Sequence, residues 1–188
     1  KTKQIVGAEA LLRWNHPEKG FISPAQFIPV AERTRMIVPI GAWVLQEACM
    51  QCRKWLEMGL FSGKMAVNLS VVQLQNADLL NLVTSTWQDT GLPPHHLELE
   101  LAESAIRTDA ENVLAQLDSL RSRGVQISLD DFGTGYSNFS HLANLPVVML
   151  WKVLVGGFIG GLAGLARWKF DKVPGAVFVH ATFNIFGR

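Results

Sequence analysis

The sequence lacks several features that would point directly to a function. Its 188 residues carry a formal net charge of only +1, so no excess of positive charge suggests a nucleic acid polymer as partner. No Gly-rich phosphate loop follows the first predicted strand, which argues against a dinucleotide-binding fold. Because 48% of the residues are hydrophobic and 18% are charged, the chain can bury a core and does not belong to a disordered class.

Cysteine is also scarce, since the chain holds only Cys49 and Cys52. Their C-x-x-C spacing occurs in redox and zinc sites, but there is no second pair to complete a zinc site. Both residues fall inside a helix predicted over residues 40–58. That position favours a buried structural role over a redox or metal role.

The N-terminus has neither a signal peptide nor an initiator methionine. It begins with Lys1 and runs directly into a segment that resembles a strand. We therefore expect a cytoplasmic protein whose given sequence starts inside a longer chain.

The first 146 residues alternate between short apolar segments and amphipathic stretches. Strands are predicted over residues 5–12, 64–69, 97–101 and 125–129, and helices from residue 23 and over 40–58, 78–90 and 108–124. Ser23 and Gln26 form a capping-box pattern, and Gly59 and Gly91 are suited to end the two helices that precede them. This order predicts parallel strands, either in an open doubly wound sheet or in a (β/α) barrel.

Each predicted strand ends in a polar side chain. These side chains are Glu9, Asn68, Glu100 and the adjacent pair Asp130 and Asp131. In a barrel the carboxyl ends of the strands open onto one face, where catalytic groups collect. Carboxylate and amide oxygens favour Mg²⁺ or Mn²⁺, and a two-metal site would suit phosphodiester hydrolysis. The alternative is that these residues are helix caps or solvated loop residues.

At these positions the chain resembles the EAL family of cyclic-di-GMP phosphodiesterases. Four motifs carry the resemblance, namely Glu-Ala-Leu-Leu-Arg-Trp at 9–14, Asn-Leu-Ser at 68–70, Glu-Leu-Ala-Glu-Ser at 100–104 and Asp-Asp-Phe-Gly-Thr-Gly-Tyr-Ser at 130–137. Ala102 stands where the third motif usually has threonine. The similarity covers residues 1–146 and includes Phe-Ile-Ser-Pro at 21–24 and Pro-Ile-Gly at 39–41.

The resemblance implies a TIM-like barrel that opens cyclic di-GMP to the linear dinucleotide pGpG. The implied ligands of its two Mg²⁺ or Mn²⁺ ions are Glu9, Asn68, Glu100, Asp130 and Asp131, of which Glu9, Asp130 and Asp131 are the implied catalytic residues, acting through the metals. Arg13 is expected to contact the substrate, and Glu103 to brace the loop that begins at Asp130. A homodimer formed through the EAL fold is a further implication.

The family pattern breaks near residue 147. Counted from Asp130, the family's catalytic lysine should fall at position 151, where this chain has Trp151. Lys152 stands one place late, and in a strand a shift of one residue turns the side chain to the opposite face. The family's first strand and its later glutamate and glutamine motifs are also missing. We therefore expect an incomplete barrel with an exposed edge, an uncovered apolar interior and impaired activity.

Residues 147–188 form a second, Gly-rich region of different composition. They hold 7 of the 16 glycines, and 5 Lys/Arg against 1 Asp/Glu. Residues 147–166 are long and apolar enough to span a bilayer. Residues 173–186 faintly resemble the last helix of CPBP-type intramembrane proteases, in which His180 and Asn184 would share one helix face. We expect an apolar helical tail, either a membrane segment or a product of frameshift or gene fusion.

Two functions follow from these observations. The first is hydrolysis of cyclic di-GMP, impaired by truncation. The alternative is a non-catalytic EAL-like module that binds cyclic di-GMP or a protein partner in bacterial second-messenger signalling. In either case, residues 147–188 could attach the protein to a membrane.

Overall fold

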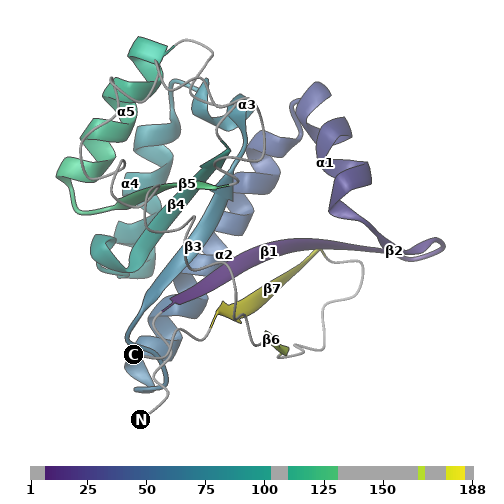
Figure 1. Ribbon diagram of the computed structural model, residues 1–188, viewed down its shortest axis with the longest axis horizontal. Helices are drawn as coiled ribbons and strands as arrows, with labels where there is room; N and C mark the ends of the chain where they lie inside the picture. The colour runs from purple at the N-terminus through teal and green to yellow at the C-terminus, as the bar shows by residue number, and fades with distance from the viewer. Residues whose placement is uncertain (1–6, 103–109, 131–164, 168–176, 185–188) are drawn as a thin grey trace.

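A computed structural model describes residues 7–102, 110–130, 165–167 and 177–184 of the chain (Figure 1). The strands in these residues are β1 (Gly7–His16), β2 (Gly20–Ile22), β3 (Lys64–Leu69), β4 (Leu97–Ala102), β5 (Gln126–Asp130), β6 (Leu165–Arg167) and β7 (Val177–Asn184). They form one sheet in the order β5-β4-β3-β1-β7-β6, with β2 paired to β1. The strands β1, β3, β4 and β5 are parallel, whereas β2 and β7 run antiparallel to β1.

Helices connect the parallel strands in the predicted order. They are α1 (Pro24–Arg33), α2 (Ile37–Glu57), α3 (Val71–Leu74), α4 (Leu79–Thr90) and α5 (Ala110–Ser122), with a short 3-10 helix η1 (Pro94–His96) before β4. In Figure 1, α2 passes behind β1 and β3. The parallel strands and their helical connections confirm an α/β fold of the incomplete TIM-like barrel type.

The ends of the helices follow local sequence signals, with one exception. Gly59 and Gly91 adopt the left-handed conformation, both with φ +66°, and terminate α2 and α4 as predicted. Ser23 precedes α1, but its side chain makes no capping hydrogen bond, so the predicted capping box is wrong. The backbone N–H of Gln26 instead donates to the backbone oxygen of Ser23 at 2.9 Å, so this N–H needs no side-chain cap.

Alternate residues of the parallel strands form the hydrophobic core. The buried positions are Ala8, Ala10, Met65, Val67, Leu69, Leu97, Leu99, Leu101 and Ile127. They belong to one cluster with buried residues of α2, α4 and α5, among them Leu45, Val83 and Leu120. Burying a side chain of this size stabilises the fold by about 1.5–3 kcal/mol, so this face fixes how the strands sit against the helices.

The opposite face is polar or small in β3, β4 and β5 and in β1 as far as Glu9. Its residues are Glu9, Lys64, Ala66, Asn68, Glu98, Glu100, Gln126 and Ser128, by the pairing register. Lys64 Nζ, for example, donates to Gln126 Oε1 across the sheet. The expected uncovered apolar interior is therefore wrong for β3, β4 and β5, because their apolar positions face the helices; in β1, Leu11 lies on the same face as Glu9.

The described parts of the tail are strands, so the predicted helical tail is wrong there. β7 pairs antiparallel with β1 over six residue pairs, from Glu9 opposite Thr182 to Trp14 opposite Val177. Residues 177–184 are rich in β-branched and aromatic side chains, which suit a strand. Residues 9–14 of β1 are thus paired and do not form the expected exposed edge, whereas β5 ends the sheet within the described residues.

The structure tests the predictions for the two apolar segments of the tail to different extents. Residues 147–164 of the predicted membrane span lie outside the described residues, and the last two residues of that span are in β6. Within the described ranges, no helix is long and apolar enough to cross a membrane. His180 and Asn184 lie in β7, where residues four apart are separated by about 13 Å, so the predicted pairing on a helix face does not form.

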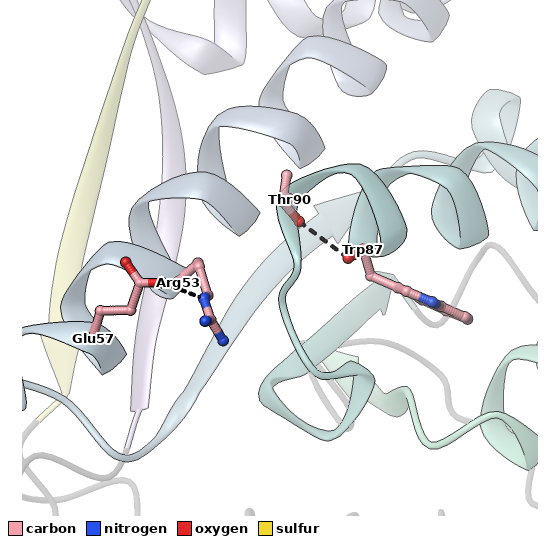
Figure 2. Close-up of polar contacts among 4 residues, drawn as sticks. All are labelled: Arg53, Glu57, Trp87 and Thr90. Carbon is pink, nitrogen blue, oxygen red and sulfur yellow. Dashed lines mark hydrogen bonds and ion pairs between the residues drawn. The ribbon is translucent and has the colours of Figure 1, made fainter.

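Short-range polar contacts stabilise the surfaces of α2 and α4. Arg53 Nε donates to Glu57 Oε1 at 2.8 Å along the surface of α2, as Figure 2 shows. Thr90 Oγ1 donates to the backbone oxygen of Thr86 at 2.7 Å and lies 3.5 Å from that of Trp87 near the end of α4 (Figure 2). The Arg53–Glu57 pair is exposed, so it adds well under about 1 kcal/mol.

Cys49 and Cys52 lie in the interior of α2 and have no solvent exposure. The pKa of each thiol is raised from 9.0 to about 12, mainly by burial and, for Cys49, also by the neighbouring Cys52. Their buried position agrees with the prediction. Because the thiolate is the reactive form, this environment disfavours redox chemistry and metal binding.

The buried thiols give a prediction for alkaline pH. Folding favours their protonated form, so their contribution is complete below pH 9 and is lost as pH rises from 9 towards 12. Urea unfolding at pH 8 and pH 11 should show a larger loss of stability in the native chain than in a C49A/C52A variant, by at least roughly 1 kcal/mol. Equal losses in the two proteins would contradict the raised pKa values.

The pairing of β7 with β1 gives a second prediction. Residues 11–13 of β1 lie beyond the segment that pairs with β3 and have β7 as their partner. Removing residues 177–188, or making the V179P substitution, should speed amide hydrogen exchange at residues 11–13 by at least about tenfold. Amides of residues 65–68 in β3, which pair with β4, serve as the internal control. Unchanged exchange at residues 11–13 in both variants would exclude this pairing.

Candidate functional site

The parallel register places the predicted strand-end residues on one face of the sheet. Glu9 is paired with Ala66, two residues before Asn68, and Asn68 is paired with Glu100. The next strand continues the same face, since Ala102 is paired with Asp130 at the end of β5. Residues two apart in a strand share a face, so these backbone positions meet at the carboxyl edge of β3, β4 and β5. The prediction that Glu9 ends its own strand is wrong, because β1 continues to His16.

Glu9 and Asn68 are in direct contact. Asn68 Nδ2 donates to Glu9 Oε1 at 2.7 Å, a short distance that is typical of a bond to a charged carboxylate. Glu9 is half-buried and Asn68 is exposed, so the pair lies where a ligand can reach it. Glu9 Oε2 and Asn68 Oδ1 are acceptors only, which is the character that a metal ligand requires.

Glu100 is half-buried on β4 and lies between Asn68 and Ser128 in the register. Ser128 Oγ is buried and has no hydrogen-bond partner among the described residues. An unsatisfied buried hydroxyl next to a carboxylate fits a site that binds a polar ligand, an ion or water. Ser128 was not predicted, although its place two residues before Asp130 in a strand puts it on the same face.

The other predicted residues are less completely placed. Arg13 lies on β1, about 13 Å along the strand from Glu9, and its Nη1 donates to the backbone oxygen of Leu12 at 2.9 Å. Asp130 ends β5, and only its backbone position is described. The remaining predicted positions, Glu103, Asp131, Trp151 and Lys152, lie outside the described residues.

The donor set fits a hard divalent cation in chemistry. Glu9, Asn68 and Glu100 offer carboxylate and amide oxygens, which Mg²⁺ and Mn²⁺ prefer. Within the part of the chain that is described, no group of three or more His, Cys, Asp or Glu side chains lies close enough to hold a metal ion. The Glu9–Asn68 contact and Glu100 therefore form the described portion of the predicted ligand set.

A separate hollow lies between the start of α2 and the end of α3. It has a volume of about 430 Å³ and is lined by Arg35, Val38, Pro39, Val72, Gln75, Asn76 and Ala77. Arg35 has φ +60°, a left-handed conformation that is uncommon for a residue other than glycine. None of the predicted site residues lines this hollow, so it is distinct from the strand-end site.

Comparison with known families identifies the class of protein. The EAL domain model matches residues 1–151. The chain therefore belongs to the EAL domain family, as the four motifs indicated. The matched region extends past residue 146 and includes Trp151. The division into residues 1–146 and 147–188 stays a prediction.

Individual relatives agree with this assignment. The chain is 48% identical over 159 residues to the bifunctional diguanylate cyclase/cyclic di-GMP phosphodiesterase MucR of Pseudomonas aeruginosa. The aligned region covers 85% of this chain and 23% of MucR. It is 41% identical over 162 residues to an uncharacterized protein of Mycobacterium bovis, covering 86% of this chain and 52% of that protein. The chain thus spans at most about half the length of these two relatives.

Solved structures show the same fold. A complex of the MucR phosphodiesterase with c-di-GMP superimposes with a TM-score of 0.70 at 50% identity, covering 75% of this chain and 57% of that chain. The EAL enzyme Bd1971, in its form bound to cAMP and cyclic-di-GMP, superimposes with a TM-score of 0.71 at 31% identity, covering 82% and 45%.

The contact between Asn68 and Glu9 can be tested without any ligand. In an N68D variant a second carboxylate replaces the amide donor, so two negative charges face each other. We expect the unfolding free energy to fall by about 1 kcal/mol or less at pH 7, since the site is partly exposed, and to recover near pH 4 where carboxyl groups protonate. An N68A variant controls for the lost hydrogen bond and should lack the pH-dependent component. If N68D and N68A have the same pH profile, the two side chains are not in contact.

Proposed function

We propose that this chain binds cyclic di-GMP at the carboxyl edge of β1, β3, β4 and β5 and hydrolyses it to linear pGpG at an impaired rate. The Asn68–Glu9 contact carries the proposal, because it joins two predicted ligands, and Glu100, a third, is paired with Asn68 on the next strand in a chain of the EAL family. MucR, which is 48% identical over the matched region, is named for the same activity.

Five residues form the proposed metal site. They are Glu9, Asn68, Glu100, Asp130 and Asp131, of which the first three are described with their side chains. When bound, two Mg²⁺ or Mn²⁺ ions would neutralise charge on the attacking and leaving oxygens of the phosphodiester. Glu9, Asp130 and Asp131 are the proposed catalytic residues, and they would act by holding these ions. Glu103 is proposed to brace the loop that follows Asp130.

The protein's own groups orient the ligand set and the substrate. Asn68 fixes the orientation of the Glu9 carboxylate through their 2.7 Å hydrogen bond. Arg13 lies on the same strand as Glu9, where its guanidinium is suited to a phosphate oxygen of the dinucleotide. Formation of pGpG adds water across one phosphodiester. The phosphorus gains a hydroxyl oxygen, and the ribose 3′ oxygen leaves and takes up a proton.

The second candidate function is a module that binds cyclic di-GMP or a protein partner without hydrolysing the nucleotide. Trp151 favours it, because this residue occupies the position where the family pattern calls for a lysine. A general base contributes roughly 10²- to 10⁴-fold to such reactions, so its loss would leave binding intact and slow turnover.

Turnover and binding can be measured on the same preparation. With Mg²⁺ or Mn²⁺ present, we expect the 188-residue chain to convert cyclic di-GMP to pGpG slowly, as followed by chromatography. Cyclic di-GMP should also raise the melting temperature. An E9Q variant should bind Mn²⁺ at least about tenfold more weakly and lose turnover. An E57Q variant, altered on the far surface of α2, is the matched control and should behave as the native chain.

A W151K variant separates the two candidates. If the missing lysine limits a working site, W151K should raise turnover by about tenfold or more, whereas a K152A variant should not change it. Binding of cyclic di-GMP with no turnover in either the native chain or W151K would support the non-catalytic module. Absence of both binding and turnover would refute hydrolysis and binding of cyclic di-GMP, and of the two candidates only the module that binds a protein partner would remain.

Location and assembly are further parts of the proposal. We propose a cytoplasmic protein that forms a homodimer through the EAL fold, with membrane attachment through residues 147–188 as the alternative location. Light scattering of the purified chain tests the homodimer. Sedimentation with membranes that persists in high salt would favour attachment, and release into the soluble fraction would favour the cytoplasm.

A further inference from the structure

One buried polar side chain has no part in the proposed chemistry. Gln73 is only 4% exposed and lies on the four-residue helix α3, directly after the strand that carries Asn68. A buried amide costs stability unless its polar atoms are bonded, so its position calls for a structural or functional explanation.

Gln73 forms a reciprocal capping box with Ser70. Gln73 Oε1 accepts from the Ser70 amide at 3.2 Å, and Ser70 Oγ accepts from the Gln73 amide at 3.3 Å. Ser70 is two residues after Asn68, so these bonds fix the turn in which β3 ends. A helix of four residues is not stable by itself, and the turn therefore depends on such contacts.

The side chain of Gln73 also requires a glycine in α2. A Cβ at Gly41 would lie 1.9 Å from Gln73 Nε2, 2.5 Å from Cδ and 2.9 Å from Oε1, well inside van der Waals contact. The amide thus lies directly against the backbone of α2. Glycine disfavours a helix interior relative to alanine, and Gly41 is the fifth residue of α2, so this close approach explains why glycine is present.

We infer that Gln73 is a positioning residue for the strand-end site: seated against Gly41, its amide holds the turn after β3 and thereby keeps Asn68 against Glu9. The inference rests on the proposed function, in which Asn68 and Glu9 are metal ligands. It also gives a role to the Pro-Ile-Gly motif at residues 39–41, which the site does not otherwise use. The mechanical path runs from α2 through Gln73 and Ser70 to Asn68, whose Nδ2 bonds Glu9 at 2.7 Å.

Variants at the two positions should be coupled. G41A should push the Gln73 amide away from Ser70, because a flexible side-chain end yields more readily than a helix backbone. Q73A should remove the same contact directly. In the Q73A background, G41A should raise the melting temperature, since the clash is gone and alanine is the better helix former. In the native background G41A should lower it or raise it less.

Two readouts report on Asn68 itself. The first is the NMR signal pair of the Asn68 side-chain amide, assigned by its loss in N68D, and the second is Mn²⁺ affinity measured with the metal alone. Q73A and G41A should shift the amide signals and weaken Mn²⁺ binding by about tenfold. Q75A is the matched control, because Gln75 is an exposed glutamine at the end of the same helix, and it should change neither readout.

A Q73M variant covers the case in which Q73A does not fold. Methionine keeps the side-chain volume but offers only a weak thioether acceptor to the Ser70 amide hydrogen, so it should shift the Asn68 signals while the chain stays folded. Folded Q73A or Q73M with native Asn68 signals would overturn the inference. If the native chain binds no Mn²⁺, the proposed metal site fails, and the Asn68 signals still decide whether Gln73 positions that side chain.

Discussion

The parallel ladder formed by β1, β3, β4 and β5 is the constraint on which the rest of the structure depends. Its pairing register sends one set of alternate residues, such as Leu99 and Val67, into the helices and the other set to the polar face. A slip of one residue in β3 would exchange Asn68 with a core leucine. The position of the site is therefore enforced by the burial of apolar side chains that take no part in its chemistry.

The polar face of the sheet allows an incomplete barrel to stay folded in water. A closed barrel with an apolar interior would expose that interior when strands are missing, whereas Lys64, Gln126 and Glu98 on this face are compatible with water. The remaining difficulty is the edge of β1, whose backbone groups need partners. β7 pairs with that edge along residues 9–14, so part of the tail takes a place in the sheet next to the strand of Glu9.

Residues outside the candidate site hold the Glu9–Asn68 pair in position. The Glu9–Asn68 bond joins the third residue of β1 to a residue near the end of β3 and is exposed to solvent, where a single hydrogen bond holds a side chain only weakly. The capping box of α3 is partly buried and Gln73 itself is only 4% exposed, so its contact with Gly41 is shielded from competition by water. A rigid helix of 21 residues, α2, thus serves as the support for a short turn that carries a proposed ligand.

The sequence by itself determined the strands and helices of the first 130 residues and indicated where the candidate site lies. Period-2 and period-3.6 patterns gave β3 and β4 nearly to the residue, glycines marked the ends of α2 and α4, and the polar strand ends indicated Glu9, Asn68 and Glu100. These signals are local, because each depends on neighbours within a few residues. The missed Ser128 carried a local signal too, as a polar residue two positions before Asp130 in the same strand.

Only the tertiary structure decided the pairing of β7 with β1 and the seating of Gln73 on Gly41. The sequence of residues 177–182 is equally compatible with an apolar helix. These residues form a strand because β1 offers unpaired backbone groups to bond. Gln26 and Gln73 occupy the same kind of sequence pattern, yet only Gln73 forms a capping box. Which partner a backbone group or a buried amide finds depends on segments distant in sequence, and periodicity does not encode that.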